Sequence, residues 1–128
     1  KYNGVIYGGD CYLFGLLAMG LVDIVIEYGL SNYDYMALIP IVKSAGGVIT
    51  DWTGKELPME ATNGAVLACG DPVLHKKVVE LIMILIVPPF NLPPIKRNKA
   101  EAKEIKKGLI RLLENYKIAD NLTVLASL

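Results

Sequence analysis

The chain has 128 residues, of which 53% are hydrophobic, and 13 basic and 13 acidic residues give it a formal net charge of +0. This length fits one modest domain, and the hydrophobic content excludes a chain that is disordered over most of its length. The zero net charge argues against a nucleic acid or an acidic membrane as a partner of the whole chain. The charge is uneven, since residues 1–95 carry 5 basic and 9 acidic side chains, whereas residues 96–128 carry 8 and 4.

The two cysteines, Cys11 and Cys69, lie far apart in apolar sequence. Without C-x-x-C spacing, neither a disulfide scaffold nor a zinc site is expected, and a reducing compartment fits best. The apolar run at residues 78–87 is shorter than the roughly 20 residues that a membrane-spanning helix needs. The chain begins "KYNGVIY", without an initiator methionine, so we expect the natural gene product to begin further upstream.

Three elements are predicted in the first part of the chain. Residues 10–20 follow the glycines of "GGD" and contain almost no polar side chain, which predicts a buried helix. The segment "VDIVIE" (22–27) predicts a strand, with its alternate apolar residues on one face and Asp23 and Glu27 on the other. A helix is then expected over residues 34–44, with a kink or an early end at Pro40 and a stop at Gly46-Gly47.

The next part continues the alternation of strands and helices. "GVIT" predicts a strand, "DWTGKEL" a turn into a short second strand, and "AVLACG" (65–70) a buried third strand. "DPVLHKKVVELI" predicts a helix with Asp71 as its cap and Pro72 at its first position. We expect His75 on the exposed side of this helix, because it adjoins two lysines and no nucleophile has a matching partner.

The last third of the chain differs in composition. Four prolines within "VPPFNLPP" predict a stiff, extended linker over residues 87–95, which separates a domain at residues 1–86 from a tail at residues 96–128. Within the tail, apolar residues recur at helical spacing over residues 98–116, which predicts an amphipathic helix. Its basic side chains are expected to form a solvated face, and its role is unknown.

Three carboxylates are candidates for a functional site, because Mg²⁺ prefers carboxylate oxygens and a phosphate group brings more oxygen ligands. Asp34 opens the predicted helix, where it can cap the backbone, bind a metal, or do both with its two oxygens. Glu27 ends a strand, so it is either a solvated strand end or a ligand-facing group at a sheet edge. Asp10 is either a helix cap or part of a binding site.

The segment "YDYMALIPIVKSAGGVITDWTGKEL" (33–57) resembles the C-terminal signature of the inositol monophosphatase superfamily, and the resemblance covers about residues 1–83. An aromatic-Asp pair opens a helix that ends in Ala-Gly-Gly, and a strand and an Asp-x-x-Gly-Lys turn follow. Together with "GGDCYLFGLLAMGLVDIVIEYGL", it is more similar to the histidinol-phosphate phosphatases than to the inositol enzymes. The resemblance implies an α/β fold: the C-terminal half of a layered α-β-α-β-α sugar-phosphatase-like domain, followed here by the amphipathic helical tail.

The resemblance also implies a function and roles for individual residues. The expected reaction is Mg²⁺-dependent hydrolysis of a phosphomonoester, in particular L-histidinol phosphate. Asp34 would be a Mg²⁺ ligand, Glu27 would contact the substrate, and the loop of Gly8, Gly9 and Asp10 would form part of the substrate pocket. The Asp10 carboxylate would pair with the cationic amine of histidinol phosphate, a charge that an inositol ring lacks.

The chain departs from the family pattern in one important respect. The upstream Glu and the D-P-x-D-G-T motif, which hold most of the Mg²⁺ ions, do not occur in this sequence. We therefore assign no catalytic residue and expect this chain alone to be inactive. The expected partners are a phosphate ester, the N-terminal half of the fold, and a second copy in a homodimer of the complete enzyme.

Two alternatives stay open from the sequence. An inositol or other sugar monophosphatase would use the same fold and the same metal. A non-catalytic interaction module, or a truncated product, would use neither. The resemblance implies a chloroplast location in a plant and a cytosolic one in a bacterium.

Overall fold

The computed structural model describes residues 5–59, 64–86 and 124–126 of the chain. Helices and strands alternate, which confirms the predicted α/β class. The elements are β1 (Val5–Tyr7), α1 (Cys11–Ala18), β2 (Ile24–Glu27), α2 (Asn32–Tyr35), α3 (Leu38–Ser44), β3 (Val48–Asp51), β4 (Val66–Cys69), α4 (Pro72–Ile86) and β5 (Val124–Ala126).

The five strands form one mixed sheet in the order β1-β5-β2-β4-β3. Strands β1, β5 and β2 run parallel, while β4 is antiparallel to both β2 and β3. The C-terminal segment therefore supplies a strand between β1 and β2, which the sequence patterns do not predict.

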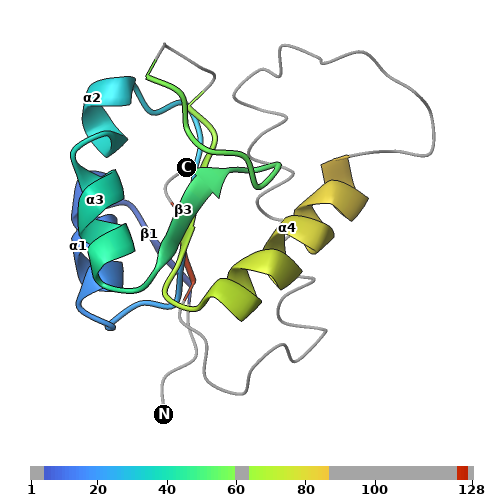
Figure 1. Ribbon diagram of the computed structural model, residues 1–128, viewed down its shortest axis with the longest axis horizontal. Coiled ribbons are helices and arrows are strands. Elements are labelled where there is room, and N and C mark those ends of the chain that lie inside the picture. The colour runs from blue at the N-terminus through green and yellow to red at the C-terminus, as the bar shows by residue number, and fades with distance from the viewer. Residues whose placement is uncertain (1–4, 60–63, 87–123, 127–128) are drawn as a thin grey trace.

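The helices cover both faces of the sheet (Figure 1), with α1, α2 and α3 on one side and α4 on the other. Alternate residues of β4 divide between the two cores. Leu67 and Cys69 pack with Leu74, Val78 and Ile82 of α4. The other core, on the side of α1 and α3, consists of Leu13, Phe14, Leu17, Val22, Val25, Tyr35, Val42, Ile49, Val66 and Ala68. Burial on both faces explains why β2 and β4 are almost entirely apolar.

The helix predicted over residues 34–44 is wrong in its start and its continuity, because the structure divides it into α2 and α3. Ser31 is the N-cap of α2, and Asp34 lies three residues further on. A continuous helix would need the N–H of Pro40 to bond to the carbonyl of Met36, and proline has no N–H. The chain instead restarts, which places Pro40 in the first turn of α3, where the missing donor is tolerated.

Two further local predictions agree with the structure. Asp71 Oδ1 accepts the Val73 N–H at 2.9 Å as the cap of α4, and Gly46 has the positive φ of 87° expected of a helix stop. The short strand predicted after "DWTGKEL" does not form in the described residues up to 59. The linker predicted at residues 87–95 and the helix predicted at residues 98–116 lie outside the described residues.

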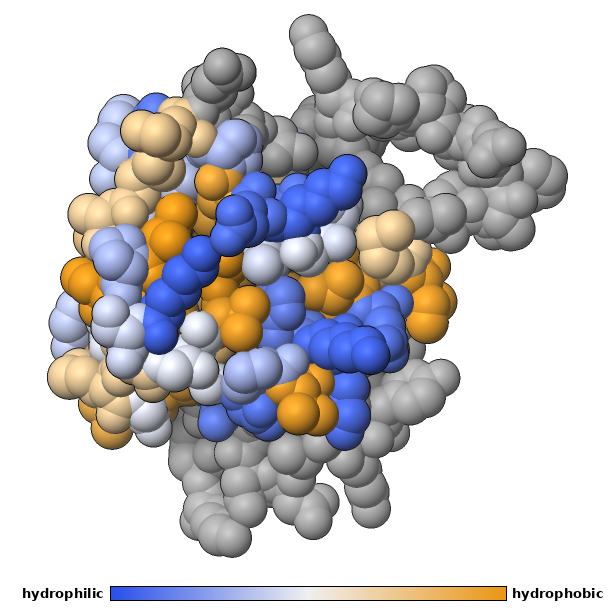
Figure 2. All heavy atoms as spheres, viewed as in Figure 1, coloured by the Kyte–Doolittle hydropathy of each residue, from blue (hydrophilic) through white to orange (hydrophobic). Residues whose placement is uncertain are grey.

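The surface is mixed in character. Among the described residues seen in Figure 2, hydrophobic and hydrophilic atoms are interspersed over the face that carries α3 and α4. An exposed ion pair, Lys43 Nζ to Glu56 Oε1 at 3.1 Å, links α3 to the turn that follows β3. In the part of the chain that the structure describes, no helix has the length and apolarity to cross a membrane.

Candidate functional site

Four of the five predicted site residues lie where the parallel strands end, and the fifth, Asp34, lies in α2. Gly8, Gly9 and Asp10 directly follow β1, and Glu27 is the last residue of β2. In the register of the sheet, Tyr7 and Ile26 both pair with Ala126 of β5. Two strand spacings separate β1 from β2, so these two segments lie about 10 Å apart at the same edge. Such carboxyl edges of parallel strands are common binding positions in α/β proteins.

The loop before α1 has an unusual backbone. Gly8, Gly9 and Asp10 have φ angles of 85°, 113° and 40°, all in the region that favours glycine. Gly9 approaches the helix closely, since a Cβ there would lie 2.8 Å from Leu13 Cδ2. Its carbonyl accepts the Tyr12 N–H at 2.9 Å, which ties the loop to the first turn of α1. Glycine is thus required at position 9 by both conformation and space.

Asp10 occupies the N-cap position of α1, yet its side chain makes no capping hydrogen bond. The interpretation of Asp10 as a helix cap through its carboxylate is therefore wrong. The residue is exposed, and its φ of 40° with ψ of −122° is a conformation that non-glycine residues rarely adopt. Its carbonyl accepts the Leu13 N–H at 3.2 Å, but its carboxylate has no such local role, and a side chain kept in a strained backbone is a candidate for function.

Glu27 is completely buried, with an exposed fraction of 0%. The alternative of a solvated strand end is therefore wrong. A buried carboxylate is costly unless it is paired or hydrogen-bonded, so its position at the end of β2 is not an accident of the surface. The neighbouring sequence carries the signal, because Ile24, Val25 and Ile26 form an unbroken apolar run in which both faces of the strand are buried.

Asp34 closes the first turn of α2. Its Oδ2 accepts the Ser31 N–H at 2.7 Å, and its own N–H donates to the Ser31 carbonyl at 2.9 Å. Asp34 is therefore not the N-cap that opens the helix, because Ser31 occupies that position and the Met36 N–H donates to the Asn32 carbonyl. The carboxylate thus accepts a hydrogen bond from the residue three positions before it, through one of its two oxygens, and the side chain is half-buried.

A Mg²⁺ ion needs several oxygen ligands. Among the described residues, no group of three or more His, Cys, Asp or Glu side chains is placed to hold a metal ion. Asp34 is the one ligand predicted in this chain, and one of its oxygens already accepts a backbone hydrogen bond. The described residues therefore do not by themselves make a Mg²⁺ site.

Comparison with known proteins identifies the family. Residues 3–85 match the inositol monophosphatase family. The chain belongs to this family. It is 49% identical over 86 residues to the bifunctional phosphatase IMPL2, chloroplastic, of Arabidopsis thaliana. The aligned region covers 62% of this chain and 25% of that protein. It is 39% identical over 54 residues to the histidinol-phosphatase of Chlorobaculum parvum, and this aligned region covers 41% of this chain and 21% of that protein.

A solved structure supports the same membership. An inositol monophosphatase from Zymomonas mobilis superposes with a TM-score of 0.54 and 45% sequence identity over 57% of this chain and 28% of that one. The described structure is thus similar to part of the inositol monophosphatase fold. The chain spans about a quarter of the length of these family members, 25% and 21% of the two relatives and 28% of the solved chain.

The sequence analysis missed a buried polar pair on the opposite side of the sheet. His75 is only 7% exposed, so its predicted surface position is wrong. Its Nε2 lies 2.8 Å from Thr50 Oγ1, and that oxygen lies 2.7 Å from the Asp51 carbonyl. Burial lowers the pKa of His75, which favours the neutral ring. His75 lies three and seven residues before the buried Val78 and Ile82, and this spacing places it on the same buried face of the helix.

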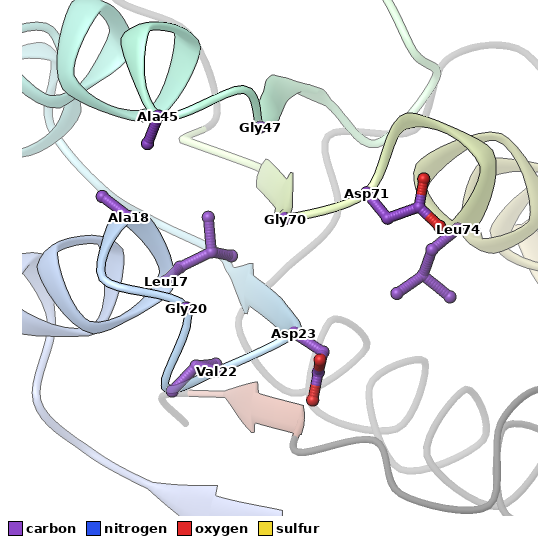
Figure 3. Close-up of a pocket in the computed structure, with 10 residues that line it drawn as sticks. All are labelled: Leu17, Ala18, Gly20, Val22, Asp23, Ala45, Gly47, Gly70, Asp71 and Leu74. Carbon is purple, nitrogen blue, oxygen red and sulfur yellow. The ribbon is translucent and has the colours of Figure 1, made fainter.

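A pocket of about 260 Å³ lies at the other end of the sheet (Figure 3). It is formed by the end of α1, the start of β2, and the junction of β4 with α4, so it contains none of the predicted site residues. Asp23 and Asp71 contribute carboxylates to its lining. Burial, with added repulsion from Asp71 and Asp23, raises the pKa of the Cys69 thiol, which disfavours the reactive thiolate.

Proposed function

We propose that this chain supplies the substrate-selecting part of a Mg²⁺-dependent phosphatase that hydrolyses L-histidinol phosphate to L-histidinol in histidine biosynthesis. The observation that carries this proposal is the state of Asp10. Its carboxylate is exposed at the edge where β1 and β2 end, it caps nothing, and it is held in a strained backbone. A free carboxylate in that position suits a substrate with a positive charge.

Histidinol phosphate has such a charge on its amino group, whereas an inositol phosphate presents neutral hydroxyls around the ring. A charge-assisted hydrogen bond contributes about 1.5–3 kcal/mol, more than a neutral one. Asp10 would therefore favour the amine-bearing ester. The Chlorobaculum relative, named as a histidinol-phosphatase, supports the same substrate class.

In this proposal, the described residues position the substrate. Gly8 and Gly9 bring the loop backbone close to it, and Asp10 binds its amine. Glu27 is buried at the end of β2 in this structure, and it would contact the substrate only where the rest of the fold exposes it. Asp34 would offer its second oxygen to Mg²⁺, and the remaining ligands would come from protein outside this chain. When bound, Mg²⁺ would stabilise the negative charge that develops on the phosphoryl oxygens and the leaving alkoxide.

An inositol monophosphatase is the second candidate, because an inositol-1-monophosphatase of Mycolicibacterium smegmatis is 35% identical to this chain over 66 residues. The same site would then bind a neutral polyol, and Asp10 would contribute little to selection. A chain without any enzymatic role is the alternative of another class. The location would follow the Arabidopsis relative, whose name places it in the chloroplast, if the source is a plant.

The test replaces the matching segment of the Arabidopsis relative with residues 1–86 of this chain and measures kcat/KM for two substrates. In the completed enzyme, Asp10→Asn should reduce kcat/KM for histidinol phosphate roughly ten- to more than hundredfold, since about 1.5–3 kcal/mol of transition-state binding is lost. Hydrolysis of inositol-1-phosphate should change by less than about twofold.

The matched control is Asp71→Asn, which removes the same charge at the opposite end of the sheet. Asparagine also serves as a helix cap, so this variant should leave both activities unchanged. Equal losses on the two substrates for Asp10→Asn would contradict selection of an amine. This chain alone should release no phosphate from either ester, and measurable turnover would show that the catalytic groups are misassigned.

A further inference from the structure

The buried pair of His75 and Thr50 joins the start of α4 to β3. Each side chain is 7% exposed, and His75 Nε2 lies 2.8 Å from Thr50 Oγ1. Thr50 donates its one hydroxyl hydrogen to the Asp51 carbonyl at 2.7 Å, so its oxygen accepts the hydrogen bond from the ring. This network assigns the ring hydrogen of a neutral His75 to Nε2. Both residues lie within the region that matches the family, residues 3–85.

The surroundings of His75 disfavour a second proton on the ring for two reasons. Burial removes the water that would solvate the charge, and this lowers the pKa of His75. The residue is also the fourth of α4, which begins at Pro72, and a positive charge is unfavourable near the N-terminal end of a helix. A protonated ring would therefore exchange its place beside Thr50 for water.

Charged and titratable groups on the surrounding elements do not offset this effect. On α4, on the three neighbouring strands and on their flanking residues they are Asp71, Lys76, Lys77, Glu80, Cys69, Asp51, Lys55, Glu56, Asp23, Glu27 and Tyr28. Asp71 Oδ1 accepts the Val73 N–H, and Asp51 Oδ1 accepts the N–H groups of Thr53 and Lys55. The backbone thus already engages these two carboxylates. Burial lowers the pKa of His75 without a resolved contribution from any of these described groups.

We propose that the His75–Thr50 pair is an acid-sensitive latch: when the ring takes up a proton, the contact breaks and the first turn of α4 separates from β3. The opening stays local, because Val78 and Ile82, both 0% exposed, hold the later turns of α4. Short units at the end of a helix open at lower free energy than the sheet beneath them. The latch lies on the face of the sheet opposite α1 and α2, so it is independent of the proposed phosphatase activity.

The size of the response follows from the linkage between protonation and opening. A ring released into water has the ordinary pKa of 6.5, whereas the buried ring has a lower pKa. The closed form therefore keeps its full advantage above pH 6.5 and loses up to about a factor of ten for each pH unit below it. Leu74 and Asp71, beside the latch, line the pocket in Figure 3, so the opening would also change that pocket.

Hydrogen exchange in the full chain, followed by NMR, tests the latch without any substitution. The His75 N–H donates to the Asp71 carbonyl at 2.9 Å within the first turn, so its exchange reports the opening. After correction for the intrinsic pH dependence of exchange, its protection should fall roughly three- to thirtyfold between pH 6.5 and pH 5. The Ala68 N–H in β4 should keep its protection. His75 is the only histidine in the sequence, so its ring titration in the same samples fixes the size of the expected fall.

The variants His75→Gln and Thr50→Ser separate the latch from other effects of acid. Glutamine does not titrate in this range, so the protection of residue 75 should become independent of pH. Serine retains the hydroxyl group and should retain the pH response. Unchanged protection between pH 6.5 and pH 5, an equal loss in β4, or the same response in His75→Gln would overturn the proposal. The first two outcomes require no variant to fold, and none of them depends on phosphatase activity.

Discussion

The backbone at Asp10 makes a specific prediction about stability. Its φ of 40° places a non-glycine residue in a conformation that costs of the order of 1–3 kcal/mol. Glycine adopts this conformation without the penalty but loses about 0.5–1 kcal/mol more in backbone entropy on folding. The side chain of Asp10 makes no capping bond, so removing it sacrifices no local contact of that kind. We expect Asp10→Gly to stabilise the chain by about 1 kcal/mol, which raises Tm by roughly 4–8 °C in a domain of this size.

The assay is urea or thermal unfolding of the full chain, with Asp10→Ala as the matched control. Alanine removes the same carboxylate but keeps the Cβ, so it should retain the strain and show little gain. The comparison thus isolates backbone conformation from charge. If Asp10→Gly is no more stable than Asp10→Ala, the backbone at this position is not strained, and the argument that function maintains it loses its support.

Two further predictions concern the packing between the sheet and its helices. Burial lowers the pKa of His75, so its neutral form contributes stability that is complete above the unfolded value of 6.5 and is lost as the pH falls below it, at up to about 1.4 kcal/mol per pH unit. The difference in unfolding free energy between the unmodified chain and His75→Gln should therefore shrink between pH 7 and 5, and a constant difference would refute this. Gly47→Ala should destabilise by about 1–3 kcal/mol, because its Cβ would lie 2.9 Å from the Cys69 carbonyl oxygen, whereas Gly15→Ala, with open space around it, should be neutral or stabilising in the same unfolding assay.

Elements with strong local signals could be predicted from the sequence. The Asp71-Pro72 pair sets the start of α4 because an Asp side chain and a proline each favour a particular position there. Gly46 ends α3 because its positive φ is accessible to glycine. The start of α2 could not be predicted, since Asp34 and Ser31 both have the chemistry of a cap and only the folded chain decides between them.

The candidate site was predictable in its residue types and only partly in its geometry. A carboxylate after a glycine pair and another at a strand end can be found by pattern. The burial of Glu27 depends on helices packing over both faces of β2, and that information lies in elements distant along the chain. His75 was missed for the same reason, because its adjacent lysines indicate solvent while Thr50, on a strand before it, provides a buried partner.

Strand β5 connects these observations to the proposed site. Gly8, Gly9 and Asp10 follow β1, and β1 joins the sheet through β5 alone among the described strands. The distance between Asp10 and Glu27 therefore depends on a strand that comes from outside the matched family region. Any segment that pairs between β1 and β2 in parallel register would keep these strands two strand spacings apart. The geometry of substrate selection consequently rests on the backbone pairing that joins β1 to β2 through β5.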